Sequence, residues 1–317
     1  MTLLDFRPAP WLRGPHAQTI GPALFPAAPI RGPVETIDVP VAAGTRVRIV
    51  LTLPKAKPRG TLLLIHGLGG SAESRYMRRT AVQAHARGWA VARLNLRNCG
   101  GTEALAATLY NAGQSGDAEA ALQALEARGL QRPYGLVGFS LGGNLAMRYA
   151  GLSGNACRAD AVVGVNPPVD LPLCVDAIER AGNILYNVHF THNLCAHLRR
   201  IRRVRDVPGP KASLRAIGGI RGFDELFTAP DAGYRSAADY YRGASAGPVL
   251  SGLRRPALIV SAQDDPFVPV SMFDAHRTAS TSLRFAHPRT GGHCGYWGRS
   301  WPRFWAAEAA LRFFERE

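Results

Sequence analysis

The segment Gly138-Phe139-Ser140-Leu141-Gly142 has the pattern Gly-x-Ser-x-Gly and joins two kinds of predicted structure. Residues 135–139 before the serine are typical of a short buried strand, and residues 141–150 have a helical pattern. A serine on such a sharp strand-to-helix turn is exposed above the sheet, and its backbone passes so close to other chain segments that only small flanking residues fit. This context predicts that Ser140 is a nucleophile. The alternative is a glycine-rich turn with an incidental serine.

A second glycine-rich segment, His66-Gly67-Leu68-Gly69-Gly70, directly follows an apolar run at 61–65 that predicts a strand buried on both faces. Attack on a carbonyl group puts negative charge on its oxygen, which backbone N–H groups can stabilise. One such donor is the residue after the nucleophile, here Leu141, and the best candidate for the other is Leu68. Gly67 leaves room for this approach, whereas His66 is expected to be structural. The alternative is an ordinary turn at the end of a strand.

A candidate general base lies near the end of the chain, in Gly291-Gly292-His293-Cys294-Gly295 after a short strand predicted at 283–285. In proteins with a serine on such a turn, the triad follows the chain order Ser, Asp, His. A carboxylate would orient the imidazole, and Asp264 and Asp265 both follow the apolar run 257–261. Adjacent residues of an extended segment point to opposite sides, so only one of the two can face His293.

The cysteines and the other histidines give no indication of a metal site, a cofactor or a thiol nucleophile. The five cysteines are far apart and include no Cys-x-x-Cys pair, which favours a reducing compartment over a disulfide framework or a zinc site. His189, His192 and His197 are close in sequence but belong to no His-Glu-x-x-His motif, so we interpret them as loop or cap histidines. Cys294 stands beside the candidate base and not on the serine turn, which argues against a thiol nucleophile.

The formal net charge of +15 does not by itself indicate a nucleic-acid partner. Only 3 of the 38 basic residues are lysines, and the arginines are scattered without a nucleic-acid-binding motif. No signal peptide is recognisable, and no apolar run approaches the ~20 residues needed to cross a bilayer. We therefore expect a cytoplasmic protein that does not bind nucleic acid; the sequence does not indicate its oligomeric state.

Strand and helix patterns alternate along the chain, which predicts an α/β fold with a mostly parallel sheet covered by helices on both faces. The further strands are expected at 47–53, 89–96 and 161–165, and the further helices at 74–87, 115–128 and 301–317. We expect a single domain over residues 1–317, with a cap inserted at about 170–247, where the alternation breaks. Within the cap, the run Arg199–Arg205 predicts a helix with apolar residues on one side and arginines on the other. Such a helix favours either a solvated cap surface or peripheral contact with an anionic membrane.

Several sequence blocks resemble the AB-hydrolase type-4 family, which comprises bacterial YheT-like hydrolases and eukaryotic α/β-hydrolase-domain lipases. Besides the segments quoted above, the matching blocks are Pro15–Ile20, Leu96–Gly101, Tyr110–Asp117, Asn166–Leu171, Phe223–Asp224 through Tyr240–Tyr241, and Asp264–Phe267. They extend over nearly the whole chain. The sequence departs from the family at Asn98, where relatives usually have Gly, and at Asn111, where they usually have His.

The resemblance implies an α/β-hydrolase fold and hydrolysis of carboxylic esters, from small molecules to lipids, without a cofactor. It also implies that Asp265, the second aspartate of its block, is the triad acid, and the position of Asp265 shortly before Val268-Pro269 favours the same residue. Asp264 is then expected to brace the loop by accepting backbone hydrogen bonds. A thioesterase or acyltransferase would use the same acyl-enzyme, although no His-x-x-x-x-Asp pattern favours acyl transfer. A hydrolase-fold binding protein would be expected to lack part of the triad, and here each member is present.

Overall fold

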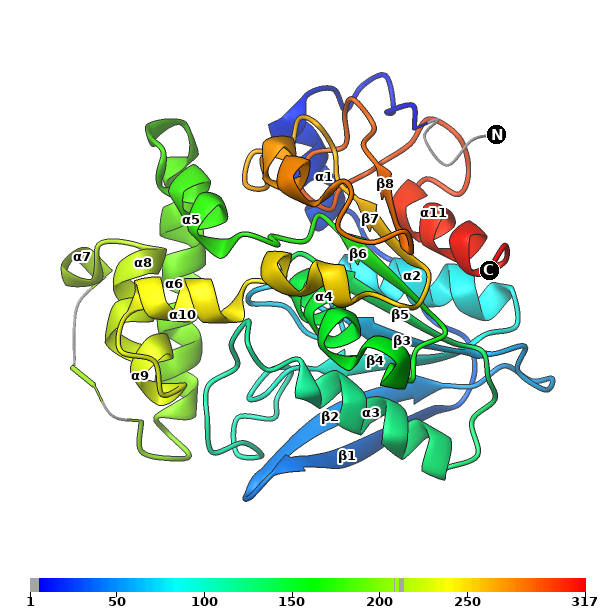
Figure 1. Cartoon of the computed structure of the whole chain (residues 1–317), viewed down its shortest axis with the longest axis horizontal. Coiled ribbons are helices and arrows are strands. Elements are labelled where there is room, and N and C mark those ends of the chain that lie inside the picture. The colour runs from blue at the N-terminus through cyan, green and yellow to red at the C-terminus, as the bar shows by residue number, and fades with distance from the viewer. Residues whose placement is uncertain (1–5, 208, 211–213) are drawn as a thin grey trace.

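The strands build one eight-stranded sheet in the part of the chain that this computed structural model describes, residues 6–207, 209–210 and 214–317. Their order is β1-β2-β4-β3-β5-β6-β7-β8 (Figure 1). The strands span Val34–Ala42 (β1), Thr45–Thr52 (β2), Thr61–Ile65 (β3), Ala90–Asn95 (β4), Tyr134–Phe139 (β5), Ala161–Val165 (β6), Ala257–Val260 (β7) and Leu283–Ala286 (β8). The predicted fold class is confirmed.

Only the two strands at one edge are antiparallel: β1 pairs with β2, and β2 pairs with β4 in the same manner. All other pairs, from β4 through β3 to β8, are parallel. Each residue of β3, β4, β5, β6 and β7 is buried, as continuous apolar runs predict for strands covered on both faces. Strand β1 is mostly exposed, and it was not predicted from the sequence.

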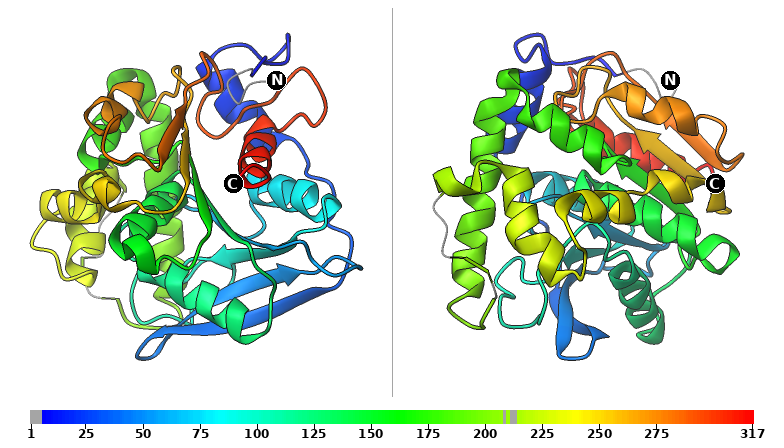
Figure 2. Two further views of the ribbon diagram at one scale, coloured as in Figure 1. Left: turned by 45° about the vertical axis from the view of Figure 1, so that its right-hand side comes forward. Right: turned by 60° about the vertical axis from the view of Figure 1, so that its left-hand side comes forward.

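Helices cover both faces of this sheet (Figure 2). On one face, α2 (Arg75–Ala86) and α11 (Trp305–Phe314) pack on side chains such as Val137 and Phe139. On the other face, α3 (Gly116–Ala127) and α4 (Leu141–Ser153) pack on residues such as Leu136. The sheet residues alternate between these two cores because successive side chains of a strand point to opposite faces.

Between β6 and β7 the chain leaves this alternation and forms a group of helices beside the sheet, on the left in Figure 1. They are α5 (Leu171–Glu179), α6 (Ile184–Ile201), α7 (Leu214–Ile217), α8 (Ile220–Phe223), α9 (Ala229–Asp231) and α10 (Ala237–Ala244). We call this segment, about residues 170–247, the cap. One expectation within it is wrong: α6 ends at Ile201, so the basic run continues through a turn and does not form one helix.

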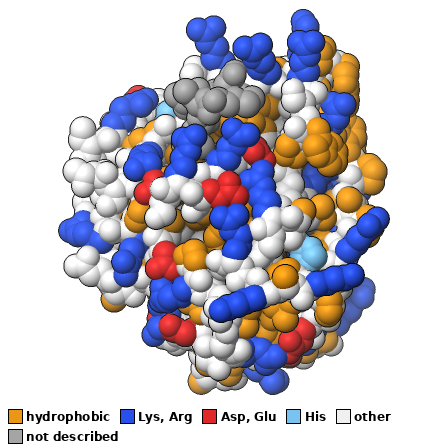
Figure 3. Space-filling view, turned by 90° about the vertical axis from the view of Figure 1, so that its right-hand side faces the viewer, with side chains coloured by type: hydrophobic (Ala, Val, Ile, Leu, Met, Phe, Trp, Pro, Cys, Tyr) orange, Lys and Arg blue, Asp and Glu red, His pale blue; other side chains and the backbone are white. Residues whose placement is uncertain are grey.

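Charged side chains are dispersed over the surface. On the face shown in Figure 3, arginines and lysines lie singly or in small groups with acidic residues between them. Several arginines of the chain form ion pairs, such as Arg312 with Glu308 and Arg284 with Glu317. No helix of the described residues has the length and apolar character required of a membrane span.

Candidate active site

Ser140 occupies the turn between β5 and α4, and its backbone has φ 51° and ψ −121°. A non-glycine residue with positive φ is strained and is held there only by its surroundings. The Ser140 N–H donates to the Val165 carbonyl at the end of β6, 2.8 Å away. A Cβ atom on Gly138 would lie 2.0 Å from the Gly142 carbonyl oxygen, and one on Gly142 would lie 2.4 Å from that of Ile65. Both flanking positions therefore require glycine.

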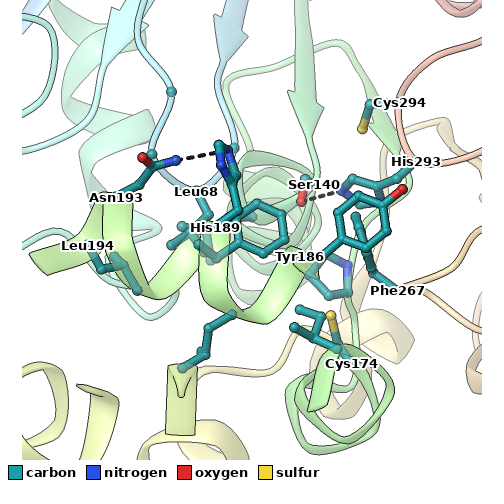
Figure 4. Close-up of a pocket in the computed structure, with 18 of the residues that line it drawn as sticks. Leu68, Ser140, Cys174, Tyr186, His189, Asn193, Leu194, Phe267, His293 and Cys294 are labelled. Carbon is teal, nitrogen blue, oxygen red and sulfur yellow. Dashed lines mark hydrogen bonds between the residues drawn. The ribbon is translucent and has the colours of Figure 1, made fainter. Parts of the chain in front are cut away.

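The serine hydroxyl meets the predicted histidine (Figure 4), and this histidine in turn meets the predicted aspartate. Ser140 Oγ lies 2.8 Å from His293 Nε2. His293 Nδ1 lies 2.8 Å from Asp265 Oδ2. Because an ionised carboxylate only accepts hydrogen bonds, Nδ1 carries the imidazole proton and Nε2 is free to accept the serine proton. This is the arrangement of a nucleophile, a base and an orienting group.

The two neighbouring aspartates have separate partners. Asp265 Oδ1 accepts from the N–H groups of Phe267, at 2.8 Å, and Val268, at 3.1 Å. Its Oδ2 faces His293. Asp264 instead accepts from the Gly292 N–H, at 2.9 Å, in the loop that carries the histidine. The side chains thus diverge: one reaches the imidazole and the other reaches the backbone of the loop.

The electrostatic surroundings of His293 favour its charged form. Burial is the largest single effect and lowers the pKa of this imidazole, but the interactions with Asp265 and Cys294 together outweigh burial and hold the pKa well above its ordinary value. An imidazole that gains a proton from a serine would be stabilised by the same carboxylate. The site can therefore hold a proton on His293 while the serine oxygen bonds to another atom.

Asn166 also belongs to the site. It lies in one of the family blocks, but the sequence predicted no role for it. Its buried side chain donates to Asp265 Oδ2 and, at 3.3 Å, to the Gly292 carbonyl. The side-chain oxygen Oδ1 of Asn166 accepts from the Cys294 N–H at 3.3 Å. Asn166 has φ 47°, a conformation that asparagine tolerates better than most residues. It joins the end of β6 to both the aspartate and the histidine loop.

Helix α1 (Pro15–Leu24) also holds the histidine loop, a role that the sequence did not reveal. Thr19 Oγ1 accepts from the His293 N–H at 2.9 Å. The fully buried Gln18 accepts from the Trp297 N–H at 2.8 Å. A Cβ atom on Gly295 would lie 1.7 Å from the Gln18 carbonyl oxygen, so helix and loop are in close contact. The first block of the family pattern thus contacts the last one.

The loop after β3 leaves one amide free to face Ser140. Gly67 N–H donates to the Tyr76 hydroxyl at 2.9 Å, and Gly69 N–H donates to the Tyr110 hydroxyl at 3.0 Å. Within the described residues, neither the Leu68 N–H nor the Leu141 N–H meets a protein acceptor. A Cβ atom on Gly67 would lie 3.0 Å from Ser140 Cβ, so the loop lies against the serine. These two amides are available to an oxyanion.

Two other histidines near the site have roles that differ from that of His293. His66 is buried, with Nδ1 at 2.8 Å from the Gly67 carbonyl and Nε2 accepting from the Leu96 N–H. Burial lowers its pKa to about 4, in keeping with a structural role. His189 Nε2 contacts Asn193 at the pocket wall. In the described part of the chain, no three His, Cys, Asp or Glu side chains are grouped as metal ligands.

A pocket of about 920 Å³ opens at Ser140 and His293 and extends between the sheet, α1 and the cap. Its walls are mainly apolar, with the cap contributing side chains such as Leu194, Leu198 and Phe223. This volume is within the range of small-molecule sites. The pocket can hold a ligand with a substantial hydrocarbon part next to the serine.

Comparison with known sequences agrees with this architecture. The sequence profile of the alpha/beta hydrolase fold matches residues 60–300. The chain belongs to the α/β-hydrolase family. Within this family it is YheT-like: it is 32% identical to the "Putative esterase YheT" of Escherichia coli over 255 residues, which cover 78% of this chain and 74% of that protein.

Eukaryotic relatives and solved structures extend the likeness. The "Monoacylglycerol lipase" of Saccharomyces cerevisiae is 28% identical over 82% of this chain, which spans 59% of the yeast protein. "Phospholipase ABHD3" of Mus musculus is 28% identical over 78% of this chain and 61% of its own length. The α/β hydrolase GrgF from Penicillium sp. sh18 superposes with a TM-score of 0.63 at 16% identity, covering 90% of this chain and 98% of that one. This last similarity concerns the fold.

Proposed function

We propose that this α/β-hydrolase cleaves carboxylic esters through an acyl-enzyme on Ser140. The observation that carries the proposal is the continuous hydrogen-bonded path from Ser140 Oγ through His293 to Asp265, with 2.8 Å at each step. The mainly apolar pocket at the serine and the esterase and lipase names of the relatives favour esters with a hydrocarbon part. Such esters range from small molecules to lipids.

In the first half of the proposed reaction, Ser140 Oγ attacks the ester carbonyl carbon while His293 Nε2 takes the hydroxyl proton. The carbonyl oxygen gains negative charge and accepts hydrogen bonds from the Leu68 and Leu141 N–H groups. Collapse of this intermediate breaks the bond to the alcohol oxygen, which receives the proton from His293. Asp265 stabilises the charged imidazole and keeps its tautomer fixed.

In the second half, a water molecule takes the place of the alcohol. His293 accepts a proton from the water as its oxygen attacks the acyl carbon, and the same two amides stabilise the oxyanion. The acid is released when Ser140 Oγ regains its proton. A thiol ester would be cleaved by the same steps, and an acceptor alcohol in place of water would give acyl transfer.

A fluorophosphonate probe, read by mass spectrometry, tests for an activated serine. We expect modification of Ser140 in the wild-type protein and none in Ser140→Ala. Matched ester and thioester series of increasing acyl length, assayed in water and with added alcohol, then distinguish ester hydrolysis from thioester cleavage and acyl transfer. A wild-type protein that is folded but neither labelled nor active would favour a hydrolase-fold binding protein.

The basic run Arg199–Arg205 supports a second part of the proposal, which is contact with an anionic lipid surface near the cap. Arg199 and Arg203 are exposed. Arg200 is exposed too but pairs with Glu103, and Arg202 donates to backbone carbonyls such as that of Val207. Arg199 Nε donates within its own helix, to the Cys195 carbonyl at 3.3 Å. We therefore assign lipid contact to Arg199 and Arg203.

A further inference from the structure

Polar side chains gather on one part of the mainly apolar pocket wall. Tyr110, His197, Asp224 and Tyr240, which we call the polar cluster, all line the pocket and are each at most 8% exposed. The rings of Tyr110 and His197 lie 5.5 Å apart. Buried polar groups cost free energy unless they find hydrogen-bond partners. A purely apolar ligand would leave these buried polar groups without partners, so the cluster indicates a ligand that carries a polar group.

Part of the hydrogen-bonding capacity of the cluster is unused. The hydroxyl oxygens of Tyr110 and Tyr240 accept from the Gly69 and Ala112 N–H groups, at 3.0 and 2.9 Å. Among the described residues, neither phenol proton meets an acceptor, so both remain donors. Among the described residues, His197 Nε2 is buried and has no partner. Burial lowers the pKa of His197 to about 4, so the ring is neutral, and in the tautomer that carries its proton on Nδ1 the buried Nε2 is an acceptor.

The backbone that carries Asp224 is also unusual. Residues Asp224–Thr228 form a turn of π-helix between α8 and α9, a feature found frequently at functional sites. Tyr241 donates to Asp224 Oδ2 at 2.7 Å. Burial raises the pKa of Asp224 to about 6. A carboxyl group is thus kept at the pocket wall despite the energetic cost of its burial.

We propose that the polar cluster binds a hydroxyl group of the ester substrate. A hydroxyl both donates and accepts, so it can donate to His197 Nε2 and accept from the free proton of a cluster phenol. The substrate class is then an ester whose hydrocarbon part fills the apolar walls and which carries a hydroxyl beyond the ester bond. The hydroxyl belongs either to the alcohol portion, as in a glycerol ester, or to the acyl chain. This inference rests on the proposed ester hydrolysis.

Two matched substrate pairs test the inference and separate the two sources of the hydroxyl. Glyceryl decanoate against propyl decanoate varies the alcohol portion, and methyl 10-hydroxydecanoate against methyl decanoate varies the acyl chain. The quantity measured is the ratio of kcat/KM within each pair. We expect a ratio of about ten or more in one pair for the wild-type protein, because a site built to bond a hydroxyl rejects the analogue without it.

The variants His197→Phe and Tyr240→Phe, each checked for folding by thermal unfolding, should bring that ratio close to one. Tyr234→Phe is the matched control: Tyr234 packs against Tyr240 but does not line the pocket, and the wild-type ratio should persist. Ratios near one in both pairs for the wild type, or ratios that survive both substitutions, overturn the inference. If the wild-type protein hydrolyses none of the four esters and Ser140 is not labelled, the proposed function itself fails. If the esters of each pair are hydrolysed equally well, the proposed hydroxyl site is wrong but the proposed ester hydrolysis stands.

Discussion

At the scale of single residues, the site depends on which of two adjacent carboxylates reaches the imidazole. Asp265 contacts His293, and Asp264 contacts the Gly292 N–H. The alternation of side chains alone left both aspartates open, and the family resemblance and the Val-Pro pair that follows selected Asp265. In the structure the two side chains diverge for a physical reason. The Phe267 and Val268 N–H groups donate to Asp265 Oδ1, which leaves its other oxygen facing His293.

We predict that Asp265→Asn lowers turnover by a factor on the order of 10² or more, because the amide no longer stabilises the charged imidazole or fixes its tautomer. Asp264→Asn should cost less turnover and act mainly on stability, since it weakens one backbone hydrogen bond. Both variants are assayed on one short-chain ester after a check of folding. If Asp264→Asn is the inactive variant, the assignment of the two aspartates is wrong.

The pH dependence of activity should follow from the same pair. His293 must be neutral to accept the serine proton, so activity is low while the imidazole is protonated and rises as it loses its proton. Because Asp265 and Cys294 together hold the pKa of His293 above its ordinary value, we expect the midpoint of kcat/KM above pH ~6.5. The sequence alone predicts that activity rises between about pH 6 and 7.5. The effect of the Asp265 carboxylate on the pKa of His293 moves this expected range to higher pH.

The midpoint in Asp265→Asn, measured on its residual activity, should lie below that of the wild type because the charge that raises the pKa is gone. A wild-type profile that is flat from pH 5 to 9 with chemistry rate-limiting would rule out His293 as the base.

At the scale of elements, the histidine loop is held by parts of the chain that are distant in sequence. Helix α1 supplies Thr19, which bonds to His293 across 274 positions, and the end of β6 supplies Asn166, which bonds to the Gly292 carbonyl across 126. Both contacts involve the backbone of the loop. The position of the base is therefore set by α1 and β6 as much as by the glycines around His293.

Thr19→Val keeps the shape of the side chain but removes the acceptor of the His293 N–H. An unsatisfied buried N–H costs about 1–3 kcal/mol, part of which the loop can relieve by moving. We expect kcat to fall several-fold to about tenfold while KM changes little, since Thr19 acts through the loop. Thr52→Val on β2 is the control, because the buried Thr52 hydroxyl has no partner. Equal kinetics for Thr19→Val and the control would show that α1 does not position the base.

The basic run at the end of α6 has a separate test. Sedimentation with vesicles that contain anionic lipid should show weaker binding for Arg199→Ala/Arg203→Ala than for wild type, and the difference should shrink at high salt because screening weakens charge attraction. Arg46→Ala/Arg316→Ala is the matched control, since both arginines are exposed elsewhere on the surface. Binding that is absent or insensitive to salt would leave the run as a solvated part of the cap.

At the scale of the whole molecule, the predictable parts are those with local signals. Continuous apolar runs predicted β3, β5, β6 and β7 closely, and the glycine pattern located Ser140 and His293. Strand β1 is mostly exposed and α1 has no charged or apolar periodicity that distinguishes it, so neither was predicted. The supporting roles of Asn166 and Thr19 depend on folding contacts between distant segments, and no local pattern encodes these. The family blocks contained both residues but not their contacts.

The two halves of the chain, before and after the cap, meet at one site. Ser140 and the candidate oxyanion amides come from segments before the cap, whereas Asp265 and His293 come from segments after it. The cap between them covers the pocket with apolar side chains and with three members of the polar cluster, and the fourth member, Tyr110, comes from the segment between β4 and α3. Under the proposed function, the reacting groups come from the sheet loops and most of the selectivity comes from the cap.

The most direct test of the central claim is to observe the acyl-enzyme. A chromogenic ester is mixed rapidly with the protein, the released alcohol is followed in time, and quenched samples are analysed by intact-mass and peptide mass spectrometry. We predict an acyl adduct that maps to Ser140 and is absent from folded Ser140→Ala, whose turnover is lower by a factor on the order of 10³ or more. Ester hydrolysis by Ser140→Ala within tenfold of the wild-type rate, or an acyl adduct on another residue, would contradict the account.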